Sequence, residues 1–304
     1  MGASPAPSQR TQQPAPLPPK AIPPPRDRLQ SRLLVWTVAP ILCALSIRTI
    51  ALRLSQGVPQ HRYLLAELTI SLGFAVLVSL LKAATPAAAA CGGTICLLLS
   101  DCTWSWPPSL LHSGLPPLAA LFFLTFAATR YDRAKKEARG LSEPRTGRRA
   151  SQVIANLGIA AICAFLSKYF PELGFLACIA ALAEATSDTL SSAIGQALGG
   201  TPFLLINLRR EPPGTDGAVS LTGTLAGLLG AAAVIYAGFP SMAWSFKIVI
   251  FAAAVLGLFF DSLLGATLER RGWIGNDLVN FTSTVLAATL ALLAIGFGLP
   301  YLLR

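Results

Sequence analysis

The chain has 304 residues, of which 53% are hydrophobic and only 12% are charged. Soluble domains carry about 25% charged residues, so this composition excludes a water-soluble globular protein and indicates one that lies in a bilayer. The net charge of +10 would suggest nucleic-acid binding in a soluble chain. In a membrane protein it indicates basic cytoplasmic loops, and no nucleic-acid partner is expected.

Residues 1–30 differ in composition from the rest of the chain. Nine prolines precede Arg26, and no apolar run interrupts them. Such a segment buries too little apolar surface to offset the entropy that ordering would remove. The sequence predicts a disordered, Pro-rich cytoplasmic tail here.

Nine apolar segments follow, each close to the roughly 20 residues that cross a bilayer as a helix. They lie at residues 33–50, 63–82, 85–101, 115–129, 152–168, 172–196, 218–238, 244–266 and 279–299. The expected fold is therefore all-α, a polytopic helical membrane protein with about nine transmembrane helices. N-terminal transmembrane helices would occupy 31–129, a basic cytoplasmic loop 130–150, and a C-terminal transmembrane domain 151–304.

The basic residues predict the orientation of these helices. With the N-terminus in the cytoplasm, 18 of the 24 Lys and Arg residues fall on the inner side. Basic residues favour cytoplasmic loops, so this distribution supports a cytoplasmic N-terminus and a C-terminus on the outer side.

Carboxylates inside the predicted spans need a reason, because a charge in hydrocarbon costs several kcal/mol. Glu67, Glu184, Asp188 and Asp261 are such residues. Glu67 stands alone near the outer end of its span, where snorkelling or a partner on another helix would explain it. The other three lie nearer the inner side.

Asp188 and Asp261 have similar surroundings. Each begins the pattern Asp-(Thr/Ser)-Leu-x-small-Ala, and each is followed by a loop of the form Arg-Arg-x-x-x-Gly-x-Asp, beginning at Arg209 and Arg270. We interpret this as a parallel internal repeat in the C-terminal half, related by an axis along the membrane normal. Chance similarity between short, low-diversity segments is the alternative.

Helical spacing suggests that the two aspartates meet. Ser187, Ser191 and Gly195 recur every four residues beside Asp188, and Gly257 and Gly265 flank Asp261 at the same spacing. Small residues at such positions let helices approach closely. Neighbouring buried carboxylates are tolerated when a divalent cation lies between them, and their hard oxygens favour Mg²⁺ or Mn²⁺. Glu184, one turn before Asp188, would lie on the same face.

The segment after Arg209 and Arg210 suits a phosphate. Three glycines and several hydroxyls occur here, and backbone amides with nearby arginines bind phosphate well. The candidate residues are Gly214, Thr215, Gly217 and Ser220. A tight inner turn with topogenic arginines is the alternative interpretation.

The basic loop has a general and a specific interpretation. Its eight bases between Arg130 and Arg149 suit anionic lipid headgroups. Arg148 and Arg149 differ from the rest, because polar residues follow them into the next span. Asn276 and Asn280 likewise begin the final span, where a buried amide needs a hydrogen-bond partner.

These motifs together resemble a family of polytopic membrane proteins that includes plant phytyl-phosphate kinase and animal transmembrane protein 19. The similarity runs over about residues 115–300, in five ordered clusters. They are Arg148-Arg149 with Gln152 and Asn156, Asp188-Thr189, Pro213 to Gly217 with Ser220, Asp261-Ser262 with Gly265, and Asn276 with Asn280.

For the plant member, the resemblance implies transfer of a phosphoryl group from a nucleotide, thought to be CTP, to phytyl phosphate. In this chain Asp188, Asp216 and Asp261 would then hold Mg²⁺, with Glu184 and Asn280 assisting. Arg148, Arg149, Arg209 and Arg210 would bind phosphate oxygens, and an isoprenoid lipid phosphate would enter laterally from the bilayer. The chain has Ala193 where the resemblance leads us to expect an acidic residue.

Other functions fit some of these features. A transporter or lipid flippase also uses repeats and buried carboxylates. A cytidylyltransferase that forms a CDP-lipid would share the nucleotide and the metal but release pyrophosphate. A structural scaffold is the third alternative.

Overall fold

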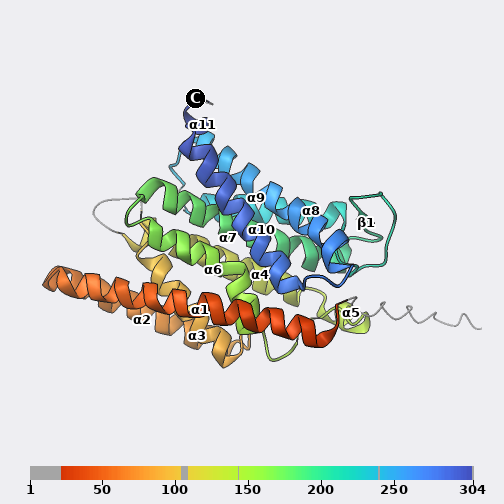
Figure 1. Ribbon diagram of the computed structural model, residues 1–304, viewed down its shortest axis with the longest axis horizontal. Coiled ribbons are helices and arrows are strands. Elements are labelled where there is room, and N and C mark those ends of the chain that lie inside the picture. Colours follow the sequence, from red (N-terminus) through yellow and green to blue (C-terminus); the bar gives the residue numbers. More distant parts are fainter. Residues whose placement is uncertain (1–21, 104–108, 143, 239, 303–304) are drawn as a thin grey trace, which may run out of the picture.

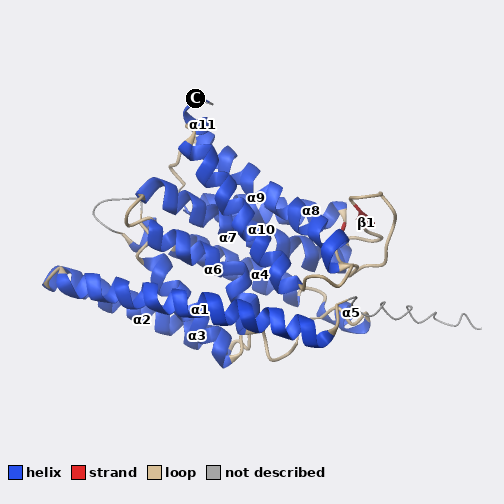
Figure 2. Cartoon of the chain, viewed as in Figure 1, coloured by secondary structure: helices blue, strands red, loops and turns tan. Residues whose placement is uncertain are grey.

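The computed structural model describes residues 22–103, 109–142, 144–238 and 240–302 (Figure 1). Helices make up most of this part of the chain, and the regular strands are one short pair (Figure 2). Most of the predicted Pro-rich tail lies outside the described residues.

Nine long helices occupy the positions of the nine predicted spans. They are α1 (Pro24–Ser55), α2 (Val58–Leu80), α3 (Pro86–Ser100), α4 (Leu115–Arg130), α6 (Ala150–Leu166), α7 (Pro171–Leu198), α8 (Leu221–Gly238), α9 (Trp244–Leu264) and α10 (Asn276–Gly296). Six are long and apolar enough to cross a membrane, while α3, α4 and α6 are shorter apolar helices. The predicted polytopic helical fold is confirmed in the described residues.

Helix α1 begins earlier than the sequence suggested. It starts at Pro24, inside the predicted tail, with proline in its first turn, where no backbone donor is lost. Its first turns contact the loop between α9 and α10 and the start of α10, since Gln30 Nε2 donates to Trp273 O at 2.8 Å and Ser31 Oγ donates to Asp277 Oδ2 at 2.7 Å. These polar contacts order a segment that carries no apolar signal.

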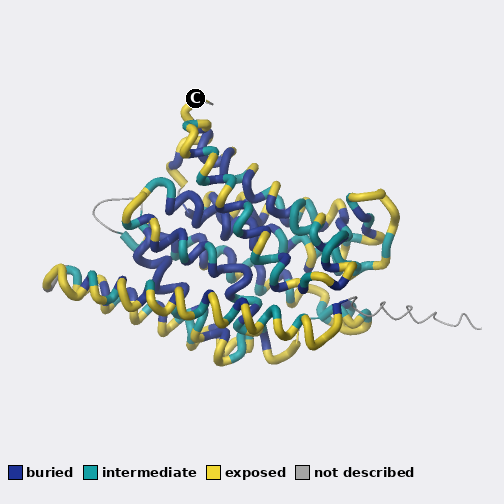
Figure 3. The backbone as a smooth tube through the Cα atoms, in the orientation of Figure 1, coloured by how far each residue is buried: buried dark blue, intermediate teal, exposed yellow. Residues whose placement is uncertain are grey.

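Helix α7 is the centre of the bundle, surrounded by α4, α6, α8, α9 and α10 (Figure 3). Of its most apolar stretch, 89% is buried, against 22% to 39% for the other five long candidate spans. Alanine, glycine and serine dominate its sequence and let these neighbours pack closely. The predicted N-terminal and C-terminal parts share one core, because Leu42 of α1 and Ile154 of α6 belong to the same cluster as Ile179 of α7.

The predicted small-residue seam is present between α7 and α8. A Cβ added at Gly223 would lie 2.4 Å from Ser191 O, and one at Gly227 would lie 2.6 Å from Ser187 O. On α9, a Cβ at Gly257 would lie 2.6 Å from Glu184 Cγ. The backbones of α8 and α9 therefore both approach α7 where its carboxylates lie.

Short elements gather at one end of the bundle. We call it the inner end, because the sequence predicts that its loops lie on the inner side of the membrane. They are α5 (Arg133–Ala138), strands β1 (Phe203–Leu204) and β2 (Ala218–Val219), and the π-helical turn η2 (Gly265–Glu269) (Figure 1). The antiparallel strands pair Phe203 with Val219 and Leu204 with Ala218. The remaining elements are the 3₁₀ turn η1 (Leu110–His112) and α11 (Leu299–Leu302), near the other end.

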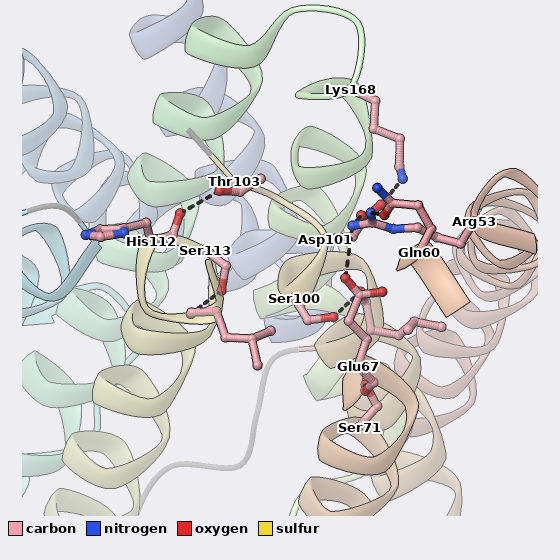
Figure 4. A network of polar contacts seen from close by, with 12 residues as sticks. Arg53, Gln60, Glu67, Ser71, Ser100, Asp101, Thr103, His112, Ser113 and Lys168 are labelled. Carbon is pink, nitrogen blue, oxygen red and sulfur yellow. Dashed lines mark hydrogen bonds and ion pairs between the residues drawn. The ribbon is translucent and has the colours of Figure 1, made fainter. Parts of the chain in front are cut away.

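A polar network lies at the opposite, outer end of the bundle (Figure 4). Arg53 of α1 forms ion pairs with Glu67 of α2, at 3.1 Å, and with Asp101, which also contacts Lys168. Gln60 accepts a hydrogen bond from Arg53. Glu67 thus has the helix partner that was one of its two predicted explanations. Burial lowers the pKa of Lys168, in the loop between α6 and α7, to about 8.

Candidate functional site

A polar cavity of about 260 Å³ opens at the inner end of the bundle. Its walls come from the inner ends of α4, α6 and α7, from the segment around β2, and from α9, η2 and α10. Segments far apart in the sequence meet here because every predicted cytoplasmic loop lies at this end. We call it the polar cavity.

Ten of the predicted site residues line the polar cavity. They are Arg148, Asp188, Gly214, Thr215, Asp216, Gly217, Ser220, Asp261, Asn276 and Asn280. Four others do not line it: Glu184 is buried beneath it, while Arg149, Arg209 and Arg210 are exposed outside it. Ala193 lines the cavity too, so the position where an acidic residue was expected faces the same space.

The intramembrane carboxylates lie at two depths. Asp188 of α7 and Asp261 of α9 reach the cavity, and Ser283 Oγ of α10 donates to Asp261 Oδ2 at 3.3 Å. Glu184 lies one turn away from Asp188, with a side chain that is 1% exposed and an Oε1 atom without a hydrogen-bond partner. A buried carboxylate oxygen without a hydrogen-bond partner is costly, so the region around these side chains is not optimised for stability alone.

Gly217 fixes the segment around β2 against the end of α9. Its φ is +72°, and a Cβ here would lie 2.1 Å from Ala266 N and 2.4 Å from Ser262 O. The contact falls at η2, where the helix widens into a π turn, a geometry that is frequent at functional sites. Glycine is therefore required for this segment to close one wall of the polar cavity.

The two similar Arg-Arg loops have different surroundings. The first contributes Asp216 to the polar cavity and the second contributes Asn276. An ion pair between Arg270 and Glu211, at 3.3 Å, joins the two loops. The second loop also contacts α1, since Arg26 Nη1 donates to Gly272 O at 3.2 Å. The internal repeat stays a prediction, but its two aspartates, Asp188 and Asp261, face one cavity.

The basic loop has a role that its composition did not reveal. Lys136 of α5 is 2% exposed, lines the polar cavity and donates to Ala128 O and Thr129 O at 2.9 and 3.0 Å. Arg139 Nη1 donates to Gln196 O at 3.1 Å. These cations satisfy carbonyls at the C-termini of α4 and α7, where the helix dipole favours positive charge. Lys136 was not predicted from the sequence, because its sequence context does not distinguish it from the other basic residues of the loop.

Arg148 and Asn156 lie where α6 enters the bundle. The backbone holds Arg148 in place, since its N–H donates to Ala83 O at 2.9 Å and its carbonyl accepts from Thr85 N at 3.0 Å. Asn156 Nδ2 donates to Gln152 O at 2.8 Å, while its buried Oδ1 has no hydrogen-bond partner. An unsatisfied amide oxygen at a cavity wall is available to a ligand.

The donor set can be compared with the needs of a magnesium ion. Among the described residues no group of three or more His, Cys, Asp or Glu side chains is placed to hold a metal alone. Mg²⁺ in phosphoryl-transfer sites uses one or two carboxylates together with substrate phosphates and water. Asp188, Asp216 and Asp261 provide hard oxygens around the polar cavity, so the residues fit a cation that arrives with a phosphate.

The chain matches the family described as integral membrane protein DUF92 over residues 69–288. It belongs to this family. The match begins within α2, so it extends further toward the N-terminus than the motifs that carried the resemblance. Every predicted site residue lies inside the matched range.

Three relatives have similar sequences. Protein VTE6, chloroplastic, of Arabidopsis thaliana is 34% identical over 239 residues, 73% of this chain and 67% of that protein. Uncharacterized membrane proteins of Synechocystis sp. and Methanocaldococcus jannaschii are 36% and 34% identical, over 59% and 58% of this chain and 72% and 74% of theirs. No solved structure matches the chain.

Proposed function

We propose that this family member is a Mg²⁺-dependent membrane kinase. It transfers the γ-phosphoryl group of a nucleotide, CTP in the first instance, to an isoprenyl or phytyl monophosphate at the cytoplasmic face. The observation that carries the proposal is the polar cavity, where Asp188, Asp216, Asp261 and Arg148 surround one space beside a Gly-containing segment. Similarity to VTE6, together with the resemblance to plant phytyl-phosphate kinase, supports the choice of acceptor.

Phosphoryl transfer asks the protein mainly for positioning and for charge. An oxygen of the acceptor monophosphate attacks the γ-phosphorus, the bond from that phosphorus to the β-phosphate oxygen breaks, and the nucleoside diphosphate leaves. The acceptor oxygen is already ionised, so no general base is required. Arg148 would bind phosphate oxygens, with the backbone around Gly214 and Gly217 beside it.

The residues that line the polar cavity support a proposed set of metal ligands. Asp188, Asp216 and Asp261 would hold the Mg²⁺ or Mn²⁺ ion, with Asn280 nearby, and the bound ion would supply positive charge to the transferring phosphoryl group. Glu184 lies beneath the cavity and would act through Asp188 rather than as a direct ligand. Arg149, Arg209 and Arg210 are exposed and would meet the nucleotide as it approaches.

The polar network at the outer end argues against a transport pathway that would use buried carboxylates at both ends of the bundle. Glu67 and Asp101 are the buried acids at the outer end of the described chain, and Arg53 pairs with both. A transporter would need groups at that end that exchange partners with a substrate, whereas these acids are already neutralised.

The test uses labelled nucleotides with purified protein in lipid nanodiscs and a panel of polyprenyl monophosphates. A kinase moves the label of γ-labelled CTP or ATP into the lipid, whereas a cytidylyltransferase moves the label of α-labelled CTP. The proposal predicts γ-label in a lipid diphosphate. Transfer of α-label, or no transfer to any acceptor with either nucleotide, would contradict it.

A further inference from the structure

A second cavity lies beside the polar cavity and differs from it in character. It has a volume of about 90 Å³, and its walls come from α2, α3, α4, α6 and α7. Phe74, Val78, Leu118, Leu121, Phe122 and Leu157 give it an apolar lining. We call it the apolar chamber.

The chamber and the polar cavity share one wall. Thr129, Arg148, Asn156 and Thr189 line both spaces, and Asn156 carries the buried amide oxygen that has no hydrogen-bond partner. The shared residues come from three helices and the segment before α6, so the two spaces adjoin at the inner end of the bundle. A molecule with an anionic head and a hydrocarbon tail could therefore occupy both at once.

Basic residues surround the inner end of the chamber. Lys82, Arg130 and Arg148 all line it. The Arg130 guanidinium lies 3.6 Å from the centre of the Phe126 ring and donates to Leu81 O at 2.8 Å. The chamber thus changes from aromatic to cationic toward the polar cavity, which complements the junction between a hydrocarbon chain and a phosphate.

We propose that the apolar chamber binds the phosphate-proximal stretch of a branched isoprenoid chain while the phosphate of the same lipid lies in the polar cavity. This deepens the proposed function and rests on it. The volume of the chamber, about 90 Å³, is smaller than that of an engineered cavity of about 150 Å³ that holds one benzene molecule. The chamber therefore fits only a short stretch of hydrocarbon. The remainder of the chain would extend from the chamber into the bilayer.

The chamber would orient the lipid more than it would tighten binding. Lipid tails are as apolar as leucine side chains, so moving a hydrocarbon from bilayer to chamber gains little transfer free energy. Holding the first branched unit would instead fix the direction from which the phosphate approaches Arg148. Correct orientation contributes to the rate of phosphoryl transfer.

Two glycines provide matched variants for the test. A Cβ at Gly92, in the chamber wall on α3, would meet one atom within 4 Å, the Phe74 ring edge at 3.5 Å. Larger side chains there would extend into the chamber. Gly73, on the exposed face of α2, has nothing within 4 Å of its Cβ position, so Gly73→Leu is the control for the same substitution outside the chamber.

The probe is a polyprenyl monophosphate with a diazirine on its first isoprene unit, photolysed with the full chain in phosphatidylcholine nanodiscs. We expect label on peptides of α2, α3 or α4 that line the chamber. Gly92→Leu should reduce this label about tenfold, Gly92→Ala should reduce it less, and Gly73→Leu should leave it unchanged. Thermal melting checks that each variant is folded. The Cβ that Gly92→Ala adds would lie 3.5 Å from the Phe74 ring, an ordinary van der Waals contact, so this variant is expected to fold.

The outcomes separate this inference from the proposed function. Label at sites other than the chamber, with γ-phosphoryl transfer intact and unaffected by the folded Gly92→Ala variant, would overturn the chamber and leave the kinase standing. Chamber labelling that depends on Gly92, without phosphoryl transfer, would support the lipid site and overturn the kinase.

Discussion

Asp188 and Asp261 come from different helices and face the same cavity. Two negative charges at one cavity cost free energy unless a positive charge compensates them. Each buried carboxylate costs several kcal/mol when it is ionised without a partner. The outer acid Glu67 avoids this cost through Arg53, at 3.1 Å. The inner pair has Arg148 at the same cavity, and a cation that arrives with phosphate would complete the compensation.

Ala193 offers a direct test of the metal site at the scale of one residue. It is 6% exposed and lines the polar cavity, so Ala193→Asp would add a carboxylate to the same wall. We expect Mn²⁺ affinity to increase by about tenfold, because affinity follows the number of charged ligands. Electron paramagnetic resonance titration measures it, with the uncharged Ala193→Asn as the control. Equal affinities in the two variants would contradict the site.

Lys168 makes stability depend on pH at the outer end. Its pKa in the folded protein is about 8, below the usual 10.5, because burial disfavours its charge. Between these values the unfolded chain binds more protons, so stability rises with pH across that window, on the order of 2 kcal/mol by pH 10. Lys168→Arg stays charged next to Asp101 and should lack this rise. The measurement is the melting temperature of each protein as a function of pH. If the melting temperatures of the two proteins change in parallel between pH 8 and 10, the prediction is wrong.

The sequence identified the carboxylates because acids are scarce in this chain, and an acid inside a span is conspicuous. It did not identify Lys136 or the partner of Glu67. Both depend on tertiary packing: α5 folds back onto the ends of α4 and α7, and α1 brings Arg53 to α2. Neither arrangement leaves a periodic signal.

The segment around β2 forms one wall of the polar cavity. Gly217→Ala should displace it, because the added Cβ would meet the backbone of α9 and η2 at 2.1 to 2.4 Å. We expect a large loss of phosphoryl transfer. Gly200→Ala is the control: its φ of +65° is also left-handed, but nothing lies within 4 Å, so it should cost only the conformational strain of about 1–2 kcal/mol. Equal activity in the two variants would exclude a role for the contact.

The close approach of α7 and α8 makes a separate prediction about stability. Gly227→Ala would place a Cβ 2.6 Å from Ser187 O and should lower the melting temperature, with a cost of about 2 kcal/mol for the overpacked seam. Gly73→Ala, on the exposed face of α2, should be neutral or slightly stabilising. A melting temperature of Gly227→Ala at or above that of the unaltered protein would contradict the packing.

Helices were predictable because hydrophobicity alone specifies a span, and all nine appear in the described chain. The start of α1 was not predictable, since its first turns are polar and are held by the loop before α10 and by the first turn of α10. The strands and the π turn were also missed. They depend on Gly217 meeting α9, a contact between segments about fifty residues apart.

At the scale of the whole molecule, polar chemistry is divided between two ends. The inner end carries the polar cavity and the apolar chamber beside it, and the outer end carries a closed ion-pair network. This division suits an enzyme that takes a nucleotide from one side and a lipid from the bilayer. That the inner end faces the cytoplasm stays a prediction from the basic residues, which impermeant labelling of Arg209→Cys in intact cells and in inverted vesicles would test. Labelling of this cysteine in intact cells would contradict the predicted orientation.

The most direct measurement compares γ-phosphoryl transfer in three Asp→Asn variants. Asp188→Asn and Asp261→Asn each remove one carboxylate from the polar cavity, whereas Asp277→Asn removes a buried carboxylate that accepts from Ser31 and does not line it. We predict a loss of about 10²–10³-fold in the first two and near-normal transfer in the third. Unchanged transfer in both cavity variants, each folded by thermal melting, would contradict the account.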